Sequence, residues 1–338
     1  MNDQYHEELY GKTILITGGT GSFGYQMVKK LLKYPIFKLR IFSRDEDKHR
    51  QMQNEFIKSH PDHYHKLEFV LGDVRDKSRL IDALYDVEII YHASALKQVP
   101  QVEFAPMEAY KTNTVGTQNL VDCVKESQRE IKAILISTDK AVYPVSTMGL
   151  SKAMAEKIFI SQIYDQINGS SFNCVRYGNV LGSRGSILPI WDEKIKNKEP
   201  IPITSEKMKR FFLTLEEATD LVLEATVGTK KYNTGNIYVK KAPACRIIDF
   251  AKAYAEIITG NDDYPLSFIG VRAGEKLDET LVSKEEMNHT IETDTHFIIS
   301  KITENNFVSI NEEYSTSTTQ QLSHEQITAK LKEINWSK

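Results

Sequence analysis

Lys12-Thr-Ile-Leu-Ile16, followed directly by Thr17-Gly-Gly-Thr-Gly-Ser-Phe-Gly24, is the stretch of sequence that decides the fold. The first five residues are a β-branched and aliphatic run that is typical of a buried strand. In the segment behind it, three glycines stand three residues apart, and apolar residues at helical spacing follow from Val28 to Leu32. The sequence therefore predicts a strand, a glycine-rich turn and a helix in that order.

This order is the one in which a glycine-rich turn binds a dinucleotide. Glycine permits positive φ and lets the backbone approach a pyrophosphate closely. The helix that follows offers unpaired N–H groups to the same anion. We therefore predict that the turn binds a nicotinamide cofactor through Gly18, Thr20, Gly21, Ser22, Phe23 and Gly24.

The end of the second predicted strand distinguishes NAD from NADP. An acidic side chain there would bind the ribose 2′-hydroxyl, whereas a basic side chain accommodates a 2′-phosphate. The chain has Ser43 and Arg44 at this point, and both can donate to phosphate oxygens. Asp45 follows and keeps NAD open as the alternative, but NADP is the prediction. Further cofactor contacts are expected after the third and fourth strands, at Asp73, Val74, Ala93, Ser94 and Ala95.

Short apolar runs alternate with helix-period segments through the first half of the chain. They predict an α/β fold with a Rossmann-type doubly wound parallel sheet, because strands covered on both faces are continuously apolar. We expect a dinucleotide-binding domain over residues 1–177 and a smaller mixed α/β substrate region over 178–338. A return of the chain to the sheet around residues 210–245 is left open. The predicted strands after the first are 39–42, 67–71, 89–91, 133–136 and 172–175.

The second region shows fewer signals. An amphipathic helix is predicted over 215–227 and another over 247–258, with a short strand at 237–239 between them. A last helix is expected at about 323–334, after a Ser/Thr-rich segment whose role the sequence does not reveal.

Composition excludes several classes of function. The formal net charge is −3, with 41% apolar and 26% charged residues, which gives no reason to expect nucleic acid or an anionic membrane as a partner. No apolar run approaches the roughly 18 residues that span a bilayer. The polar segment Met1–Gly11 is unlike a signal peptide. Cys123, Cys174 and Cys245 are too scattered for a disulfide framework or a zinc site, so we expect no metal and a cytoplasmic location.

Four later segments carry a family resemblance: Ala95-Leu-Lys-Gln-Val-Pro100, Ser137-Thr-Asp-Lys-Ala141, Arg176-Tyr-Gly-Asn-Val180 and Arg272-Ala-Gly-Glu-Lys276. With the glycine-rich turn they resemble the extended short-chain dehydrogenase/reductase superfamily. Within it they are similar to the UDP-N-acetylglucosamine 4,6-dehydratases that invert carbon 5 and serve polysaccharide biosynthesis such as capsule formation. The Thr-Asp-Lys motif points to this branch, since related retaining dehydratases have Thr-Asp-Glu.

The resemblance implies a lyase reaction on a UDP-sugar in three steps. Hydride leaves carbon 4 for NADP⁺, water is lost across carbons 5 and 6, and hydride returns to carbon 6 while carbon 5 is reprotonated from the opposite face. The product is a 4-keto-6-deoxy sugar nucleotide. The resemblance also implies a homo-oligomer, either a dimer or a hexamer.

The same resemblance implies the catalytic roles. Thr138 would hydrogen-bond the substrate, and Asp139 would act as general acid on the departing 6-hydroxyl. Lys140 would move the carbon 5 proton, which requires that desolvation or a nearby cation lowers its pKa. Lys152 matches the lysine of the superfamily's Tyr-x-x-x-Lys pair and would bind the nicotinamide ribose.

Met148 is where the chain departs from the family pattern, which has Tyr four residues before the lysine. A thioether cannot accept the hydroxyl proton as hydride leaves carbon 4. Three interpretations follow. Another group serves as base, with Lys140 and Tyr143 as candidates; or the oxidation step is slow; or activity is lost and only binding remains.

The remaining site residues are expected at the substrate. Arg184, Arg210 and Arg272 would pair with the UDP diphosphate, Glu275 would lie at the uridine ribose, and Lys97 would face the sugar or the cofactor. Asn179 would hold a substrate phosphate or hydroxyl.

Two other functions remain open. A UDP-hexose 4-epimerase uses the same removal of hydride from carbon 4 but needs no elimination catalyst, so Asp139 and Lys140 favour dehydration. A catalytically silent NADP-binding sensor is the third hypothesis, supported mainly by Met148.

Overall fold

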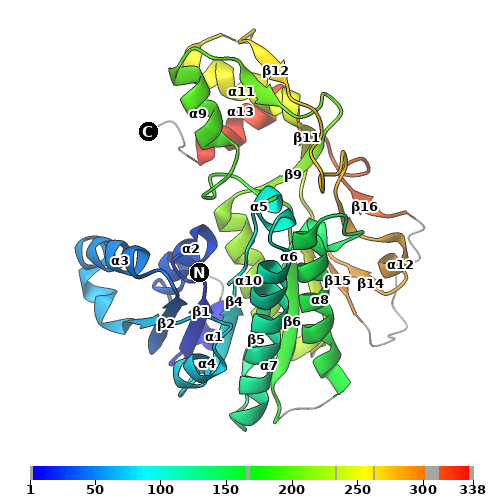
Figure 1. The fold of residues 1–338 in the computed structure, drawn as a ribbon. Helices are drawn as coiled ribbons and strands as arrows, with labels where there is room; N and C mark the ends of the chain where they lie inside the picture. Colours follow the sequence, from blue (N-terminus) through cyan, green and yellow to red (C-terminus); the bar gives the residue numbers. More distant parts are fainter. Residues whose placement is uncertain (1–2, 165–167, 233, 262, 301–311, 335–338) are drawn as a thin grey trace.

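The computed structural model describes residues 3–164, 168–232, 234–261, 263–300 and 312–334. Within these ranges nine strands form one large sheet in the order β14-β15-β10-β6-β5-β4-β1-β2-β3 (Figure 1). The strands from β3 to β10 pair in parallel, whereas β15 and β14 are antiparallel additions at one edge. The strands are β1 Thr13–Thr17, β2 Lys38–Ser43, β3 Leu67–Leu71, β4 Ile89–His92, β5 Lys132–Ile136, β6 Ser171–Arg176, β10 Ile237–Lys240, β14 Thr290–Glu292 and β15 His296–Ile299.

Helices cover both faces of this sheet, which is why β1 and β6 are buried along their whole length. Helices α7 and α8 lie on one face and α10 on the other, where it packs against α2 (Figure 1). The predicted doubly wound α/β fold is confirmed, and β1 to β6 each begin and end within one residue of the predicted runs. The helices are α2 Ser22–Leu31, α3 Glu46–Ser59, α4 Lys77–Ala83, α7 Gly116–Glu126, α8 Thr147–Ser161 and α10 Leu215–Tyr232, with α1 Asp3–Leu9 preceding β1.

The chain beyond residue 178 both extends the large sheet and builds a smaller lobe. Strands β10, β15 and β14 of this part belong to the large sheet, so the boundary at 177/178 does not separate two sheets; the two-domain division stays a prediction. In the lobe, Trp191 is fully buried and contacts the rings of Phe250 and Tyr254. The lobe and its connections contain α9 Leu188–Lys196, α11 Ile247–Thr259, α13 His324–Glu333, β7 Asn179–Val180, β8 Ile201–Ile203, β9 Lys209–Leu213, β11 Ala244–Arg246 and β12 Leu266–Phe268.

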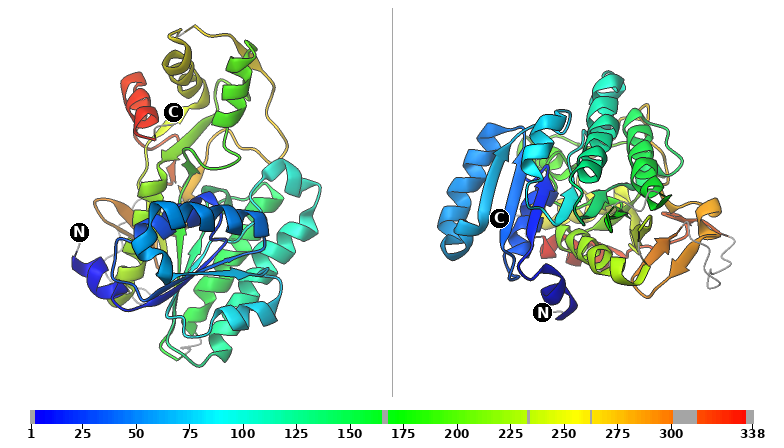
Figure 2. Two further views of the ribbon diagram at one scale, coloured as in Figure 1. Left: turned by 90° about the vertical axis from the view of Figure 1, so that its left-hand side faces the viewer. Right: turned by 90° about the horizontal axis from the view of Figure 1, so that it is seen from below.

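The lobe sits over the edge of the sheet at which the parallel strands have their carboxyl ends (Figure 2). Ligands bind in open α/β sheets at this edge, because the loops that follow the strands meet there. The loops contain α5 Val99–Glu103, α6 Pro106–Ala109, a π-helical turn Tyr110–Val115 and a 3₁₀ turn η3 Asp139–Ala141. Outside these loops, β13 Thr280–Val282 pairs with β16 Tyr314–Ser315, and α12 Lys284–Met287 follows β13. In the described ranges, no helix is both long enough and apolar enough to cross a membrane.

A buried ion cluster connects the large sheet to the segment around α12. Arg176 on β6 is 2% exposed and donates two hydrogen bonds to the carboxylate of Glu156 on α8, at 3.0 and 2.6 Å. It also donates to both carboxylate oxygens of Glu286 and to the Leu281 carbonyl. Burial would raise the pKa of Glu286, but the charge and hydrogen bonds of Arg176, with smaller contributions from Ser283 and Lys157, together lower it.

We expect Arg176→Met to reduce the free energy of unfolding by about 3–5 kcal/mol, because it leaves two carboxylates buried without their cation. Arg246→Met is the matched control, since Arg246 pairs with Asp249 at the surface and an exposed pair is worth about 0–1 kcal/mol. Urea titration of both variants measures the difference. Equal losses in the two variants would contradict a structural role for the buried cluster.

Candidate active site

A single continuous cavity of about 850 Å³ runs from the glycine-rich turn to the 3₁₀ turn η3. Its wall comes from the loops after β1, β2, β3, β4, β5 and β6, and the lobe closes the opposite side. The cavity brings together nearly all the residues that the sequence predicts for the site. Those lining it are Gly18, Thr20, Gly21, Ser22, Phe23, Gly24, Ser43, Arg44, Asp73, Val74, Ala93, Ser94, Ala95, Lys97, Thr138, Lys140, Met148, Lys152, Asn179, Arg184, Arg210, Arg272 and Glu275.

The glycine-rich turn is packed against the strand beside it. Gly18 has φ +69°, and a Cβ there would lie 2.9 Å from the backbone of Ala93 and Ser94 after β4. A Cβ on Gly24 would lie 2.5 Å from Gly19. The first turn of α2 has no side-chain cap, because its N-cap residue is Gly21. In the described part of the chain no side chain caps these first N–H groups, and residues 20–24 line the cavity, which suits an anion.

At the other side of this turn the loop after β2 presents basic side chains. Ser43 is hydrogen-bonded to Thr20 at 2.8 Å, so the two hydroxyls hold the loop against the turn. Asp45 caps α3 by accepting a hydrogen bond from the Lys48 N–H. Hydrogen bonds from the Lys48 side chain and from its backbone N–H both lower the pKa of Asp45. Lys48 also lines the cavity, as Arg44 does, and its charge was the one signal by which it could have been predicted.

Arg44 also contacts the acid that follows β3. Its guanidinium lies 3.4 Å from the Asp73 carboxylate, which Arg75 contacts at 2.7 Å. Burial would raise the pKa of Asp73, but hydrogen bonds from Arg75 outweigh it, and the net effect lowers the pKa. Asp73 is therefore an ionised acceptor at this end of the cavity.

At the end of β5, Thr138, Asp139 and Lys140 form a hydrogen-bonded group. The Thr138 hydroxyl donates to Asp139 Oδ1 at 2.8 Å, and Lys140 Nζ lies 3.0 Å from the same oxygen. Thr138 and Lys140 line the cavity, but Asp139 is fully buried and is not among the lining residues. Its Oδ2 has no hydrogen-bond partner among the described residues. This position differs from the predicted role of Asp139 as an acid that contacts the sugar.

Lys140 has a second carboxylate neighbour that the sequence analysis missed. Glu279, one residue before β13, is 1% exposed and lies 3.4 Å from Lys140 Nζ. Burial would lower the pKa of Lys140, but Asp139 and Glu279 raise it by a larger amount. The condition set for the role of Lys140, a lowered pKa, is not met by these contacts, because two anions offset the desolvation.

Lys152 shows the lowered pKa that was expected of Lys140. The side chain is buried on α8, and burial lowers its pKa to about 8. Among the described residues none forms a hydrogen bond or ion pair with its amine. Met148, one turn earlier, packs with Val102 and Ala109 and faces the cavity. Tyr143 does not line the cavity; its hydroxyl donates to Glu285 at 2.9 Å, so its geometry does not support it as the replacement base.

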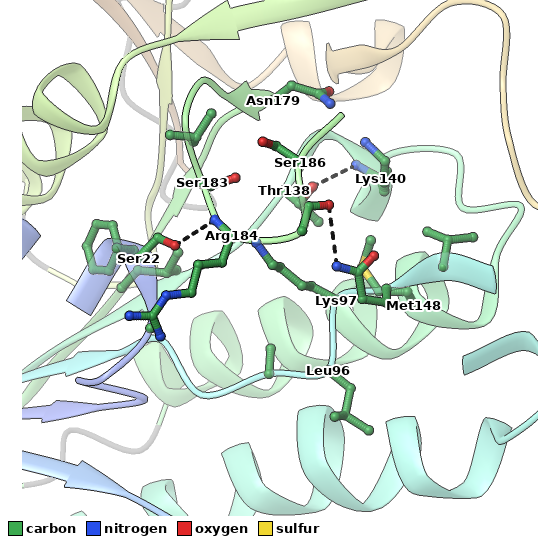
Figure 3. A pocket seen from close by; sticks show the side chains of 18 of the residues that line it. Ser22, Leu96, Lys97, Thr138, Lys140, Met148, Asn179, Ser183, Arg184 and Ser186 are labelled. Atoms are coloured by element: carbon green, nitrogen blue, oxygen red, sulfur yellow. Dashed lines mark hydrogen bonds between the residues drawn. The ribbon is translucent and has the colours of Figure 1, made fainter. Parts of the chain in front are cut away.

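The loop after β7 lies across the glycine-rich turn. The Arg184 N–H donates to Ser22 Oγ at 2.8 Å, and its guanidinium donates to the Thr20 carbonyl at 3.3 Å (Figure 3). Arg184 is thus placed at the turn, whereas the sequence analysis expected it at a substrate diphosphate. Lys97 points into the same space (Figure 3); partial desolvation lowers its pKa.

The other predicted substrate residues lie toward the lobe. Arg210 is buried on β9, donates to the Leu277 carbonyl at 3.2 Å and lies 3.9 Å from Glu279. The Glu275 carboxylate accepts from the Arg272 N–H at 3.1 Å, so these two residues form one turn at the cavity wall. Asn179 is exposed to the cavity from β7.

Tyr177 is a further cavity residue that was not predicted. It is buried beside Phe23, with which its ring stacks at 6.5 Å, and burial raises the pKa of its phenol. A raised pKa makes this phenol a poor base. The quoted segment Arg176–Val180 contained it, but nothing in the sequence distinguished its role from packing. No group of His, Cys, Asp or Glu in the described ranges has the arrangement of a metal site.

The chain matches a family of known proteins and a curated relative. Residues 14–301 match the family described as polysaccharide biosynthesis protein. A curated protein of Rickettsia rickettsii named UDP-glucose 4-epimerase is 44% identical over 281 residues, which cover 82% of this chain and 79% of the relative.

Two solved structures have a similar fold. The X-ray structure of Pen from Bacillus thuringiensis superposes with a TM-score of 0.87 at 29% identity and covers 96% of this chain and 99% of that one. DesIV of Streptomyces venezuelae, a dTDP-glucose 4,6-dehydratase solved with NAD and TYD, has a TM-score of 0.67 at 19% identity, with coverage of 78% and 86%. From the matching family and the curated relative, the chain belongs to the polysaccharide biosynthesis protein family, within the nucleotide-sugar dehydratases and epimerases.

Proposed function

We propose that this protein is an NADP-dependent UDP-N-acetylglucosamine 4,6-dehydratase that inverts carbon 5. The observation that carries the proposal is the placement of Lys140. Lys140 lines the cavity next to Thr138, and its amine is paired with two buried carboxylates, Asp139 and Glu279. Epimerisation at carbon 4 needs no group that exchanges a proton at carbon 5, whereas dehydration does.

The residues present fit a nicotinamide dinucleotide. The uncapped first turn of α2 supplies N–H donors for a pyrophosphate. Gly18 lets the turn pack against the backbone that follows β4, where a side chain would collide. Arg44 and Lys48 are two cations at the ribose end, and the Asp45 carboxylate is engaged at the start of α3, which favours a 2′-phosphate. When bound, the nicotinamide supplies a reversible hydride acceptor.

The protein's own groups then bind the sugar and move its protons. In this proposal Lys152, whose pKa burial lowers to about 8, donates to the nicotinamide ribose. Thr138 orients the substrate, and Lys140 takes and returns the carbon 5 proton. Asp139 acts through these two residues as a positioning group, since it is buried behind them. Arg272 and Glu275 bind the uridine diphosphate end of the substrate in this proposal. Arg184 holds the loop after β7 against the glycine-rich turn.

The second candidate is a UDP-hexose 4-epimerase, which the name of the Rickettsia relatives favours. The test is incubation of the purified protein with UDP-N-acetylglucosamine, followed by NMR of the product. A 6-methyl signal with loss of water supports the dehydratase. An intact hexose inverted only at carbon 4 supports the epimerase, and bound nucleotide without turnover supports the silent sensor. The homo-oligomer remains a prediction that size-exclusion chromatography tests.

Met148→Tyr should oxidise carbon 4 at least as fast as the wild type. The side chain at position 148 faces the cavity one helical turn before Lys152, so a phenol there would lie near a cation that lowers its pKa. Rapid mixing with substrate, followed through the absorbance of the reduced nicotinamide, measures the step. Met154→Tyr, at an exposed position of the same helix, is the control and should change nothing. Complete loss of activity in Met148→Tyr would show that the usual tyrosine geometry does not apply here.

A further inference from the structure

Glu279 is a buried acid in the cavity wall near η3 that no predicted step uses. In the described chain its carboxylate meets three cations from three separate segments. Lys140 Nζ lies 3.4 Å from Oε1, Lys276 Nζ lies 3.0 Å from Oε2, and Arg210 Nε lies 3.9 Å from Oε1. One buried carboxylate therefore joins η3, β9 and the segment before β13 through these three ion pairs.

The backbone on both sides of Glu279 is fixed by the Ser/Thr-rich C-terminal segment. Thr316 accepts a hydrogen bond from the Glu279 N–H at 3.1 Å through its hydroxyl, and its own N–H donates to the Glu279 carbonyl at 2.8 Å. Thr316 is fully buried. Two bonds from one residue hold position 279 at the cavity wall, so the carboxylate does not depend on Lys140 for its place.

We propose that Glu279 is a positioning residue that holds the Lys140 ammonium against the cavity wall and sets how readily Lys140 gives up its proton. This inference rests on the proposed function for its catalytic meaning, but the pairing itself does not require it. Each charged group around Lys140 shifts the pKa of its amine in a known direction. Asp139 and Glu279 favour its charged form, whereas Arg210 opposes it, and Lys276 competes for Glu279 from the other side. Removing Glu279 leaves Asp139 as the remaining acid in contact with Lys140 among the described residues.

The test is the pH dependence of Lys140 reactivity in the full-length protein. Acetic anhydride labels neutral amines, and mass spectrometry of the peptide containing Lys140 gives the pH of half-maximal labelling. In Glu279→Gln we expect this pH to fall by about 1–3 units, the usual effect of an opposite charge at this distance. Glu279→Asp keeps the charge and should restore most of the wild-type value. Asp278→Asn, which changes the neighbouring half-exposed acid that accepts from Thr316, should leave it unchanged.

An unchanged labelling midpoint in Glu279→Gln would overturn the proposal. If that variant does not fold, Lys276→Met tests the same pair with the opposite sign, because it leaves Glu279 to Lys140 and should move the midpoint upward; a midpoint that stays or falls counts against the proposal. Product assays separate the two hypotheses. If the midpoint falls while the wild type makes no 6-deoxy product, the pairing stands and the proposed function fails. If the wild type is active, the rising limb of its pH–rate profile should shift with the labelling midpoint.

Discussion

Gly18→Val is expected to weaken NADP binding at least ~100-fold, a loss of about 2.7 kcal/mol. The backbone at this position has φ +69°, which a β-branched side chain rarely adopts. Its Cβ would also lie 2.9 Å from backbone atoms of Ala93 and Ser94. Those atoms continue β4, which pairs with β1, so neither side can move without shifting the sheet. The glycine-rich turn must therefore open, and its N–H groups lose their common direction.

Gly11→Val is the matched control for this variant. Gly11 has nearly the same φ, +67°, but a Cβ there would have no atom within 4 Å. Both variants carry the conformational strain, and only Gly18→Val adds the collision at the turn. Calorimetric titration with NADP, on samples shown to be folded by circular dichroism, compares them. Binding by Gly18→Val within a few-fold of Gly11→Val would mean that the turn does not hold the cofactor.

The glycine-rich turn could be predicted because its signal is local. Strand, glycines and helix follow each other within twenty residues, and each residue's role depends on its own backbone conformation. The same holds for Lys152 and Met148, which share a helical face at fixed spacing. The strands β1 to β6 were equally readable: burial of central strands such as β1 and β6 on both faces leaves no polar alternation.

Features that depend on contacts between distant segments were not readable. Glu279 follows the quoted Arg272–Lys276 segment by three residues, but only the pairing of β13 with β16 places it beside Lys140. The burial of Asp139 has a similar cause, because Gly178, between β6 and β7, lies beside its carboxylate. Strands β14 and β15 were missed because each is short, and β14, at the sheet edge, carries Thr290 and Glu292.

The charges around Lys140 show why the type of residue alone did not predict its protonation. A buried lysine has a lowered pKa only if desolvation exceeds the attraction of nearby anions. Lys152 is desolvated and has no contacting carboxylate among the described residues, so its pKa falls to about 8. Lys140 is also desolvated but touches Asp139 and Glu279, and its pKa rises. In the proposed reaction, Lys140 therefore begins as an ammonium and must release its proton before it accepts one from carbon 5.

Lys140→Ala is expected to abolish formation of the 6-deoxy product while NADP stays bound. Loss of a general acid–base group costs about 10²–10⁴-fold, and Lys140 is the cavity-lining residue whose amine pairs with Asp139 in the described part of the chain. The variant should stall after oxidation at carbon 4, so the absorbance of reduced nicotinamide should accumulate when substrate is added. NMR in deuterated water should show no exchange at carbon 5.

Two further variants separate catalysis from stability. Removing Lys140 alone leaves Asp139 buried without its cation, which destabilises the fold. Asp139→Asn combined with Lys140→Met removes both charges at nearly constant volume and should recover much of that stability without recovering product. Lys209→Ala, a lysine outside the cavity lining, should behave as the wild type. Full activity in Lys140→Ala would remove Lys140 from the mechanism. Loss of product without any reduced nicotinamide would instead assign Lys140 to the carbon 4 hydroxyl, in the place of the base that Met148 cannot be.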